Sequence, residues 1–393
     1  MTAARPATLA LRVVHERLVL PHVPAADLSA RRPAAPGAWA LTRFGGHLTP
    51  DRLQAMVAGR TGGGPLPPWH DGSDGAHRGQ TAVVRVEDVL LAPRHGVLID
   101  AGGQVLQTTA GEMLSWKPDL AVLPHVRAQG AARLMTVPGG LPRIGAASVF
   151  MATGGEFNYG HYLLDCLAAL LAIEELGLLT ALPPLAPPLS RWQRDLAGLA
   201  FPGLEIRQTR APLVRLGEAA FASPMDHFLH RPNALLLKLR ERVLAAAPPS
   251  PGARRIYISR RAYPMRVMVN EPALEAALMA RGFTVIRAEG LTPAQQIALM
   301  RGAEVVVGAT GAGLANALFA PEGAKVFEIL PVSFANWWLR NLCHLAGVDW
   351  HGWFCPAPVD KAEVSWMYRI RRGFRWGYRP PLEDFLRFLD ERM

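Results

Sequence analysis

A histidine and an aspartate lie one helical turn apart near the middle of the chain. His161 and Asp165 fall in "HYLLDCLAALLAIEELG", whose leucines recur at helical spacing. Residues four apart share one face of a helix, so the imidazole and the carboxylate can meet. A carboxylate beside an imidazole fixes its tautomer, and such a pair can take a proton from a hydroxyl group. The spacing therefore predicts a general base or a polar binding pair. The alternative is a structural hydrogen bond at the start of a helix.

A glycine-rich turn between two apolar strands is the second candidate. The stretch "VVVGATGAGLANALFAPEGAKVFEIL" contains Gly308, Gly311 and Gly313, in an order that departs from the G-x-G-x-x-G dinucleotide fingerprint. The departure disfavours an NAD-type oxidoreductase, which remains the least favoured alternative. Glycines still let a ligand approach the backbone, and the amides of a helix start favour anionic oxygens. The simpler interpretation is a tight turn between a strand and a helix.

Charged side chains follow the strands that flank this turn. Arg260 and Arg266 lie at and after the end of a predicted strand (255–260), and Glu328 stands near the end of another (324–330). In an open parallel sheet, ligands bind beyond the carboxyl ends of the strands. The arginine fork binds phosphate oxygens bidentately, and a carboxylate can accept both hydroxyls of a ribose. We therefore predict a nucleotide diphosphate site, with surface ion pairs as the alternative for each arginine.

Regular alternation of elements in the second half would position these residues. A linker, "PPSPGAR" (248–254), precedes it, and Thr292, Pro293 and Gln295 form a helix-start signal within it. Predicted strands cover 255–260, 283–289, 304–308 and 324–330, and predicted helices cover 270–282 and 292–303. Such alternation predicts βαβ units and a parallel sheet with helices on both faces.

The first half is predicted to form a domain of its own. Short β-rich runs over 81–110 predict a small antiparallel meander. A buried strand at 147–153, a strand at 204–209 and helices at 161–177 and 231–247 follow. We therefore expect domains at 1–247 and 254–340. The aromatic, arginine-rich tail, 341–393, is expected to end in a helix and to pack back on the first domain.

Composition narrows the classes of protein and partner. Half of the 393 residues are hydrophobic and the formal net charge is +10, carried almost entirely by arginine. This charge indicates affinity for phosphate groups or an anionic membrane surface, unless it reflects codon usage alone. No zinc-finger spacing occurs, so no nucleic-acid partner is expected. No apolar run reaches the length of a membrane span. We expect a cytoplasmic protein with peripheral contact at the inner face of the membrane.

Two segments together resemble family 61 of the glycosyltransferases. They are "RRIYISRRAYPMRVMVNEPALEAALMARGFTVIRAEGLTPAQQIALMRGAEVVVGATGAGLANALFAPEGAKVFEIL" and, about a hundred residues earlier, "NYGHYLLDCLAAL". The resemblance covers roughly residues 81–345. It implies an α/β fold of the GT-B type, with two Rossmann-like domains facing across a cleft. It also implies an inverting enzyme that uses a nucleotide-sugar donor, commonly a UDP-sugar, and acts in capsular or surface polysaccharide synthesis on a saccharide or glycolipid acceptor.

Carried over by position, the resemblance assigns site residues in both halves. His161 and Asp165 are the catalytic candidates, and either could be the base. The donor-binding candidates are Ser259, Arg260, Arg266, Asn270, Glu271, Thr310, Gly311, Ala312, Gly313, Asn316 and Glu328. Thr310 stands where members of the family commonly carry a histidine before Gly-Ala-Gly. A hydroxyl can form a hydrogen bond with a phosphate or sugar oxygen but cannot carry a positive charge. This departure motivates the main alternative, a non-catalytic nucleotide- or carbohydrate-binding partner of a polysaccharide assembly complex.

The chemistry of an inverting transfer sets the remaining expectations. The acceptor hydroxyl must lose a proton, and the leaving nucleotide diphosphate must be stabilised as it gathers charge. The chain has no D-x-D triplet to hold a metal. We therefore expect arginines and helix amides to serve the leaving group, with no divalent metal and no cofactor. Asp226 and His227 form a weaker second acid–base pair. Four tryptophans could stack on sugars or belong to the core: Trp337, Trp338, Trp350 and Trp353.

Overall fold

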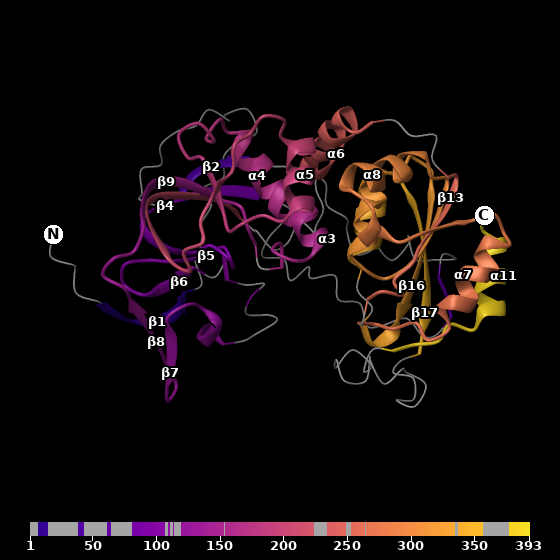
Figure 1. Ribbon diagram of the computed structural model, residues 1–393, viewed down its shortest axis with the longest axis horizontal. Coiled ribbons are helices and arrows are strands. Elements are labelled where there is room, and N and C mark those ends of the chain that lie inside the picture. The colour runs from indigo at the N-terminus through magenta and orange to yellow at the C-terminus, as the bar shows by residue number, and fades with distance from the viewer. Residues whose placement is uncertain are drawn as a thin grey trace. The chain divides into compact units, whose positions relative to one another are not determined.

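The chain divides into two units, each with its own β-sheet (Figure 1). The structure is a computed structural model. It describes residues 7–14, 38–42, 61–63, 81–106, 109–110, 113, 119–152, 154–223, 234–248, 253–263, 265–334, 337–356 and 377–393. The first unit comprises the described residues of Met1–Gly46, Arg78–Leu229 and Asn233–Leu239. The second comprises those of His47–His77, His230–Pro232 and Arg240–Met393. The predicted mixed α/β class is confirmed.

A six-stranded, wholly parallel sheet forms the second unit, in the order β14-β13-β15-β16-β17-β3. Its strands are β13 (Arg255–Ile258), β14 (Thr284–Ile286), β15 (Val305–Ala309), β16 (Lys325–Pro331), β17 (Asp349–Cys355) and β3 (Thr61–Gly63). After β13 the chain adds β14 on one side, then returns to add β15 and its successors on the other. The direction of winding therefore reverses between β13 and β15. In doubly wound sheets this reversal is the point where ligands bind.

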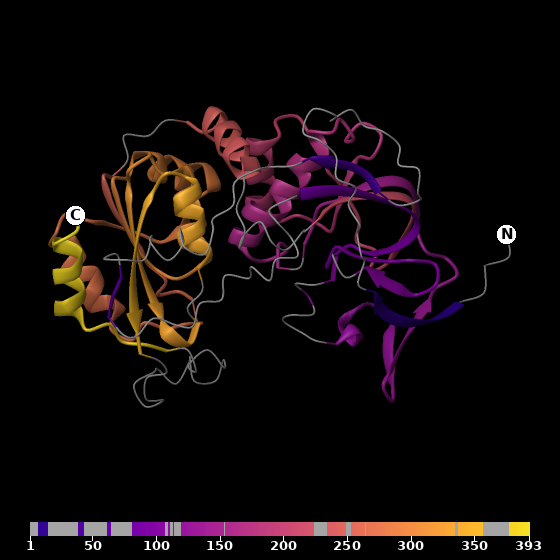
Figure 2. The same cartoon turned by 180° about the vertical axis from the view of Figure 1, so that it is seen from behind.

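Helices cover both faces of this sheet, as predicted (Figures 1 and 2). Helix α8 (Pro293–Gly302) lies on one face, and α7 (Glu271–Met279) and α11 (Leu382–Asp390) lie on the other. Helix α8 begins with the predicted capping box, in which the side chains of Thr292 and Gln295 bond each other's backbone amides. The inner strands are buried on both sides, which explains their β-branched, apolar runs.

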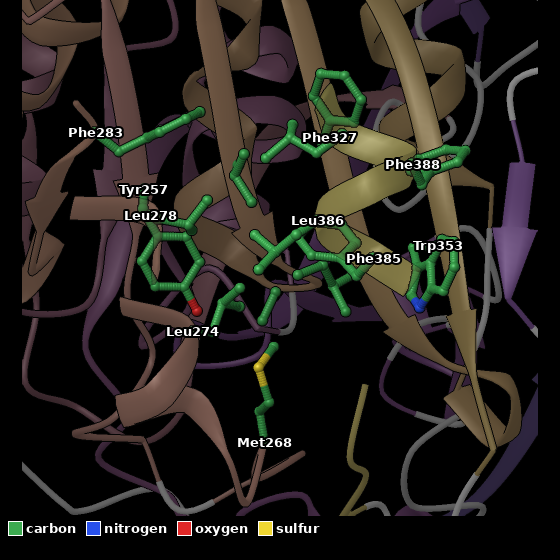
Figure 3. Packing of buried hydrophobic residues seen from close by; sticks show 14 of the residues in the cluster. Tyr257, Met268, Leu274, Leu278, Phe283, Phe327, Trp353, Phe385, Leu386 and Phe388 are labelled. Carbon is green, nitrogen blue, oxygen red and sulfur yellow. The ribbon is translucent and has the colours of Figure 1, made fainter. Parts of the chain in front are cut away.

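The face under α7 and α11 is an apolar core (Figure 3). Strand residues Tyr257, Phe327 and Trp353 pack there with helix residues such as Leu274 and Phe385. Burying one side chain of this size contributes roughly 1.5–3 kcal/mol. The predicted packing of the tail on the first domain is therefore wrong for the part of the tail that the structure describes. Strand β17 continues the parallel ladder of β16, and the apolar face of α11 completes this core.

The first unit is built on an 11-stranded mixed sheet, in the order β11-β10-β9-β12-β4-β5-β6-β1-β8-β7, with β2 paired to β4. The strands are β1 (Ala7–Val14), β2 (Ala38–Thr42), β4 (Thr81–Ala92), β5 (Val97–Ile99), β6 (Gln104–Leu106), β7 (Val126–Gln129), β8 (Ala132–Val137), β9 (Arg143–Val149), β10 (Pro184–Ala186), β11 (Arg207–Gln208) and β12 (Val214–Ser223). Strands β4, β5 and β6 form the predicted antiparallel meander, but it is part of this large sheet. Strands β9, β10 and β11 are parallel.

The helices that the structure describes with full bounds in the first unit are α3 (Tyr159–His161), α4 (Leu167–Glu174), α5 (Arg191–Ala200) and the start of α6 (Ala234–Ala246). The division between the units falls within α6, after Leu239, and not in the predicted linker at 248–254. Lys238 forms an ion pair with Glu175 in the first unit. Arg240 instead donates to the carbonyls of Ala320 and Ala346 in the second. No helix among the described residues is both long enough and apolar enough to cross a membrane.

Candidate functional site

Arg260 and Gly311 meet where the winding of the second sheet reverses. Arg260 follows β13 and Gly311 follows β15, and these strands are paired through Ile258 and Gly308. A Cβ atom placed on Gly311 would lie 1.6 Å from Nη1 of Arg260. The backbone of Gly311 is extended (φ 167°), so space and not backbone conformation requires glycine here. The guanidinium therefore lies directly on the glycine loop.

A second arginine lies close to the first. Arg266 adopts a left-handed backbone conformation (φ 54°), which is rare for a bulky residue. Its guanidinium lies 4.3 Å above the ring centroid of Phe334, while that of Arg260 lies 5.1 Å from the Tyr263 ring. In the described part of the chain, neither guanidinium forms an ion pair with a carboxylate, and both Nε atoms are buried without a hydrogen-bond partner. The two cations therefore make no direct ion pair among the described residues, and Glu271 and Glu328 act on them only through longer-range electrostatic interactions.

The electrostatics of the pair favour an anion. Burial lowers the pKa of Arg260 below its usual range. Burial, followed by repulsion from Arg260, lowers the pKa of Arg266 to about 10. Desolvation and a like charge both disfavour the charged form, and a bound anion would offset both effects because an opposite charge favours that form. Guanidinium groups bind phosphate oxygens in a bidentate manner, so a phosphate-bearing ligand fits this place.

Two of the predicted donor-binding residues, Ser259 and Glu271, stabilise the turn that carries Arg260. The carboxylate of Glu271, at the start of α7, accepts from the backbone amide of Arg260 at 2.7 Å and from the Tyr257 hydroxyl at 2.8 Å. Ser259 donates to Glu275 at 2.6 Å, and the same glutamate accepts from Arg261 at 3.0 Å. Both Glu271 and Ser259 are buried. In this structure they fix the turn after β13.

Glu328 lies inside β16 and not near its end, which corrects its predicted position. Its carboxylate is buried and accepts from the indole Nε1 of Trp350 at 3.0 Å. Burial raises the pKa of Glu328 to about 7, against hydrogen bonds from Thr310 and Trp350 and the charge of Arg266, which lower it. The group is thus held partly by Thr310, the residue that departs from the family pattern.

The other donor candidates shape the loop that carries Gly311. Ala312 begins a 3₁₀ helix, Ala312–Phe319, which follows the glycine turn. A Cβ atom on Gly313 would lie 3.2 Å from Cγ2 of Ile258, so this glycine lets the loop approach β13. Asn316 donates to Gln296 of α8 at 3.0 Å. Asn270 donates to the carbonyl of Pro380 at 2.8 Å.

The predicted acid–base pair forms in the first unit. Nδ1 of His161 lies 2.7 Å from Oδ2 of Asp165, and both side chains are buried. His161 ends α3, and Asp165 lies in a π-helical turn (Tyr162–Cys166) before α4; such turns are frequent at functional sites. The Asn158 side chain accepts from the amide of His161 at 3.2 Å. Gly154, at φ 97°, leaves room for the imidazole, because a Cβ there would lie 3.0 Å from its Cδ2.

Several expectations resolve differently. The four tryptophans at 337, 338, 350 and 353 are buried, which favours the core interpretation over sugar stacking. Asp226 and His227 lie outside the described residues. Sequence reasoning missed Phe334, whose ring contacts Arg266, and Tyr378, which interacts electrostatically with both arginines. Phe334 follows closely after the end of β16, and this position in the sequence could have suggested that its ring lies near the site. Nothing in the sequence linked Tyr378 to a turn more than a hundred residues earlier.

Comparisons with known proteins agree with the family resemblance. The family model described as Glycosyltransferase 61 matches residues 159–327. The chain is also 35% identical over 109 residues to the EGF domain-specific O-linked N-acetylglucosamine transferase of Drosophila melanogaster. That alignment covers 27% of this chain and 21% of the fly protein, so the chain spans about a fifth of that relative's length. The segment 159–327 includes His161, Asp165, Arg260, Arg266 and Gly311, and through it the resemblance to glycosyltransferase family 61 is confirmed.

Proposed function

We propose that the chain is an inverting glycosyltransferase that moves a sugar from a nucleotide-sugar, most simply a UDP-sugar, to a saccharide acceptor. The observation that carries the proposal is the contact between Arg260 and Gly311 at the reversal point of the second sheet. A pair of arginines with no direct ion pair among the described residues, on a glycine loop at that point, suits the diphosphate of an activated sugar. The family match to 159–327 supports the same class of reaction.

The proposed roles follow from the chemistry of a single displacement. The acceptor oxygen attacks the anomeric carbon, and a new carbon–oxygen bond forms as the bond to the diphosphate oxygen breaks. The leaving oxygen takes the bonding electron pair, and Arg260 and Arg266 stabilise the charge that it gathers. The acceptor proton passes to the His161–Asp165 pair, whose short contact holds the imidazole in one orientation. His161 as base with Asp165 orienting it is the first assignment, and the reverse is its alternative.

The wider setting is also part of the proposal. We propose a GT-B architecture in which the second unit binds the donor and the first unit binds the acceptor. The donor site needs no divalent metal, because the chain lacks a D-x-D triplet and supplies two arginines instead. A role in capsular or surface polysaccharide synthesis, at the cytoplasmic face of the membrane, is consistent with the net charge of +10.

A donor panel tests the proposal directly. The purified chain is incubated with single nucleotide sugars, UDP-N-acetylglucosamine first, because the fly relative is named for transferring that sugar. Released UDP is measured by chromatography, with and without oligosaccharide acceptors, and products are weighed by mass spectrometry. We expect release from at least one donor, lost in Arg260→Ala and kept in Arg254→Ala, which alters an exposed ion pair with Glu304.

The same panel separates the alternatives. Binding of a nucleotide sugar without transfer or hydrolysis would favour the non-catalytic partner of an assembly complex, which Thr310 brought into consideration. Saturable binding of NAD with a change in nicotinamide absorbance would favour an oxidoreductase. Failure of every nucleotide sugar to bind would refute a donor site in the second unit.

A further inference from the structure

A short segment near the C-terminus is tied to the residues that follow Arg266. The backbone amide of Tyr378 donates to the carbonyl of Val267 at 3.0 Å, and the amide of Val269 donates to the carbonyl of Tyr378 at 3.0 Å. These bonds make a parallel bridge between Met268 and Tyr378. The segment Tyr378–Pro380, which we call the strap, also accepts from Asn270 through the carbonyl of Pro380. The strap lies outside residues 159–327, which match the family model.

The strap fixes a strained part of the site. Arg266 has a positive φ of 54°, a conformation that persists only where the surroundings impose it. The three residues directly after Arg266 are those that form the bridge with Tyr378. The bridge therefore sets the direction in which the Arg266 backbone leaves its turn. It also brings a residue from the end of the chain next to the arginine pair.

The side chain of Tyr378 has an unused hydroxyl at this place. The residue is fully buried, and its hydroxyl has no hydrogen-bond partner among the described residues. Buried tyrosine hydroxyls usually find a partner. The phenol lies within electrostatic reach of both Arg260 and Arg266. Burial raises the pKa of Tyr378 far above its usual range, so the hydroxyl keeps its proton at neutral pH.

Three buried donors thus lack a hydrogen-bond partner among the described residues: the Tyr378 hydroxyl and the Nε groups of Arg260 and Arg266, with which the hydroxyl interacts electrostatically. An arginine N–H group can only donate, so the two arginines cannot satisfy each other. A ligand with several acceptor oxygens can satisfy all three, and a diphosphate is such a ligand. Among the described residues no carboxylate accepts a hydrogen bond from these three groups, although Glu328, whose Oε1 also lacks a partner, interacts electrostatically with Arg266.

We propose that Tyr378 binds the diphosphate of the donor, donating its hydroxyl to a phosphate oxygen beside Arg260 and Arg266. The inference rests on the proposed donor site and adds to it a residue from outside the matched segment. The strap then has two functions, because its backbone fixes the Arg266 turn and its side chain supplies a neutral donor. A neutral donor adds a bond to the leaving group without adding to the repulsion between the two arginines.

Tyr378→Phe tests this role, because it removes only the hydroxyl oxygen. Affinities for UDP, UMP and inorganic pyrophosphate are measured by calorimetry on the full chain. We expect the Kd of UDP and of pyrophosphate to rise about tenfold, which corresponds to about 1.4 kcal/mol. The preference for UDP over UMP should fall by a similar factor, because UMP lacks the second phosphate. This ratio is insensitive to a general loss of folded protein.

Tyr162→Phe is the matched control. Tyr162 is also a buried tyrosine whose hydroxyl has no partner in the described structure, but it lies in the first unit. Its variant should keep the wild-type Kd for UDP, and neither variant should melt below the wild type. An unchanged UDP/UMP preference in Tyr378→Phe, with Arg260→Ala still abolishing UDP binding, would overturn the role of Tyr378 alone. Absence of UDP and pyrophosphate binding in the wild type would instead overturn the donor site itself.

Discussion

The guanidinium of Arg260 rests on the backbone of Gly311, with Nη1 occupying the space that a side chain at position 311 would need. The two residues come from the ends of β13 and β15, between which the winding of the sheet reverses. One contact therefore joins the place where such sheets bind ligands to a side chain that binds phosphate. Both residues lie within the segment that matches glycosyltransferase family 61.

The contact makes Gly311→Ala a sharp test of the loop. A methyl group at 311 would displace the Arg260 guanidinium, so we expect the Kd for UDP to rise more than about tenfold, or more than about 1.4 kcal/mol. The extended backbone of Gly311 accepts alanine, and the end of an arginine can move. The free energy of unfolding should therefore change by less than about 1 kcal/mol. Calorimetry with UDP and urea unfolding measure the two effects.

Gly290→Ala is the control for that variant. Gly290 lies in the same unit, and a Cβ atom there would have no neighbour within 4 Å. This variant should bind UDP as the wild type does. Equal UDP affinity in Gly311→Ala and Gly290→Ala would show that the glycine loop does not hold the donor.

The His161–Asp165 pair should affect turnover and not donor binding. His161→Ala removes the imidazole of the 2.7 Å contact, and Asp165→Asn replaces the carboxylate by a neutral amide. We expect kcat to fall by about 10²–10⁴, the usual contribution of a general base. The Kd for UDP should be unchanged, because the arginine pair belongs to the second unit. His344→Ala, at an exposed histidine, serves as the control. Wild-type kcat in both variants of the pair would remove it from the mechanism.

Glu328 should make stability depend on pH. Its folded-state pKa is about 7, above the ordinary 4.5 that the unfolded chain would show. Between these values the unfolded chain releases the proton and the folded chain retains it. The stability contribution is therefore complete below pH 4.5 and is lost as pH rises through 7. The total loss is about 3 kcal/mol, at 1.36 kcal/mol for each unit of pKa.

Urea unfolding between pH 5 and pH 8 measures this slope. Glu328→Gln should flatten it, while Glu289→Gln, at an exposed glutamate of the same unit, should leave it intact. A slope in Glu328→Gln equal to that of the wild type would show that other groups cause the pH dependence.

The parallel sheet of the second unit could be predicted because each of its elements carries a local signal. The capping box at Thr292, the three valines 305–307 and the linear alternation of strands and helices all agree with the observed order. Arg260 and Gly311 could be paired in advance, since both follow parallel strands. The i, i+4 spacing likewise predicted the contact between His161 and Asp165.

Contacts between residues that lie far apart in the sequence could not be predicted from local patterns. Tyr378 reaches Met268 through a bridge across more than a hundred residues, and β3 joins the sheet from the first quarter of the chain. The sequence predicted the wrong unit for the tail because an amphipathic helix can pack on any exposed apolar face. Only the observed order of the strands shows which sheet face lacks a cover. Glu328 was misplaced for a related reason. A charged residue in an apolar run is expected at the end of a strand, where it reaches water. Glu328 can instead lie inside the strand because Trp350, distant in the sequence, donates a hydrogen bond to it.

Removal of divalent metals should leave activity unchanged. The proposal assigns the leaving group to Arg260 and Arg266, and the chain lacks a D-x-D triplet. Transfer or donor hydrolysis is measured before and after dialysis against a chelator. Loss of activity that Mn²⁺ or Mg²⁺ restores would contradict this assignment and would require a metal ion beside the diphosphate.

Thermal unfolding with UDP tests the central claim most directly, since it needs neither the sugar nor the acceptor to be known. A ligand at about a hundred times its Kd stabilises the folded state by about 2.7 kcal/mol. For a unit of this size, the melting temperature should then rise by roughly 5–10 °C. We predict this rise in the wild type and in Arg254→Ala, and its loss in Arg260→Ala. An equal rise in Arg260→Ala, or none in the wild type, would contradict the account.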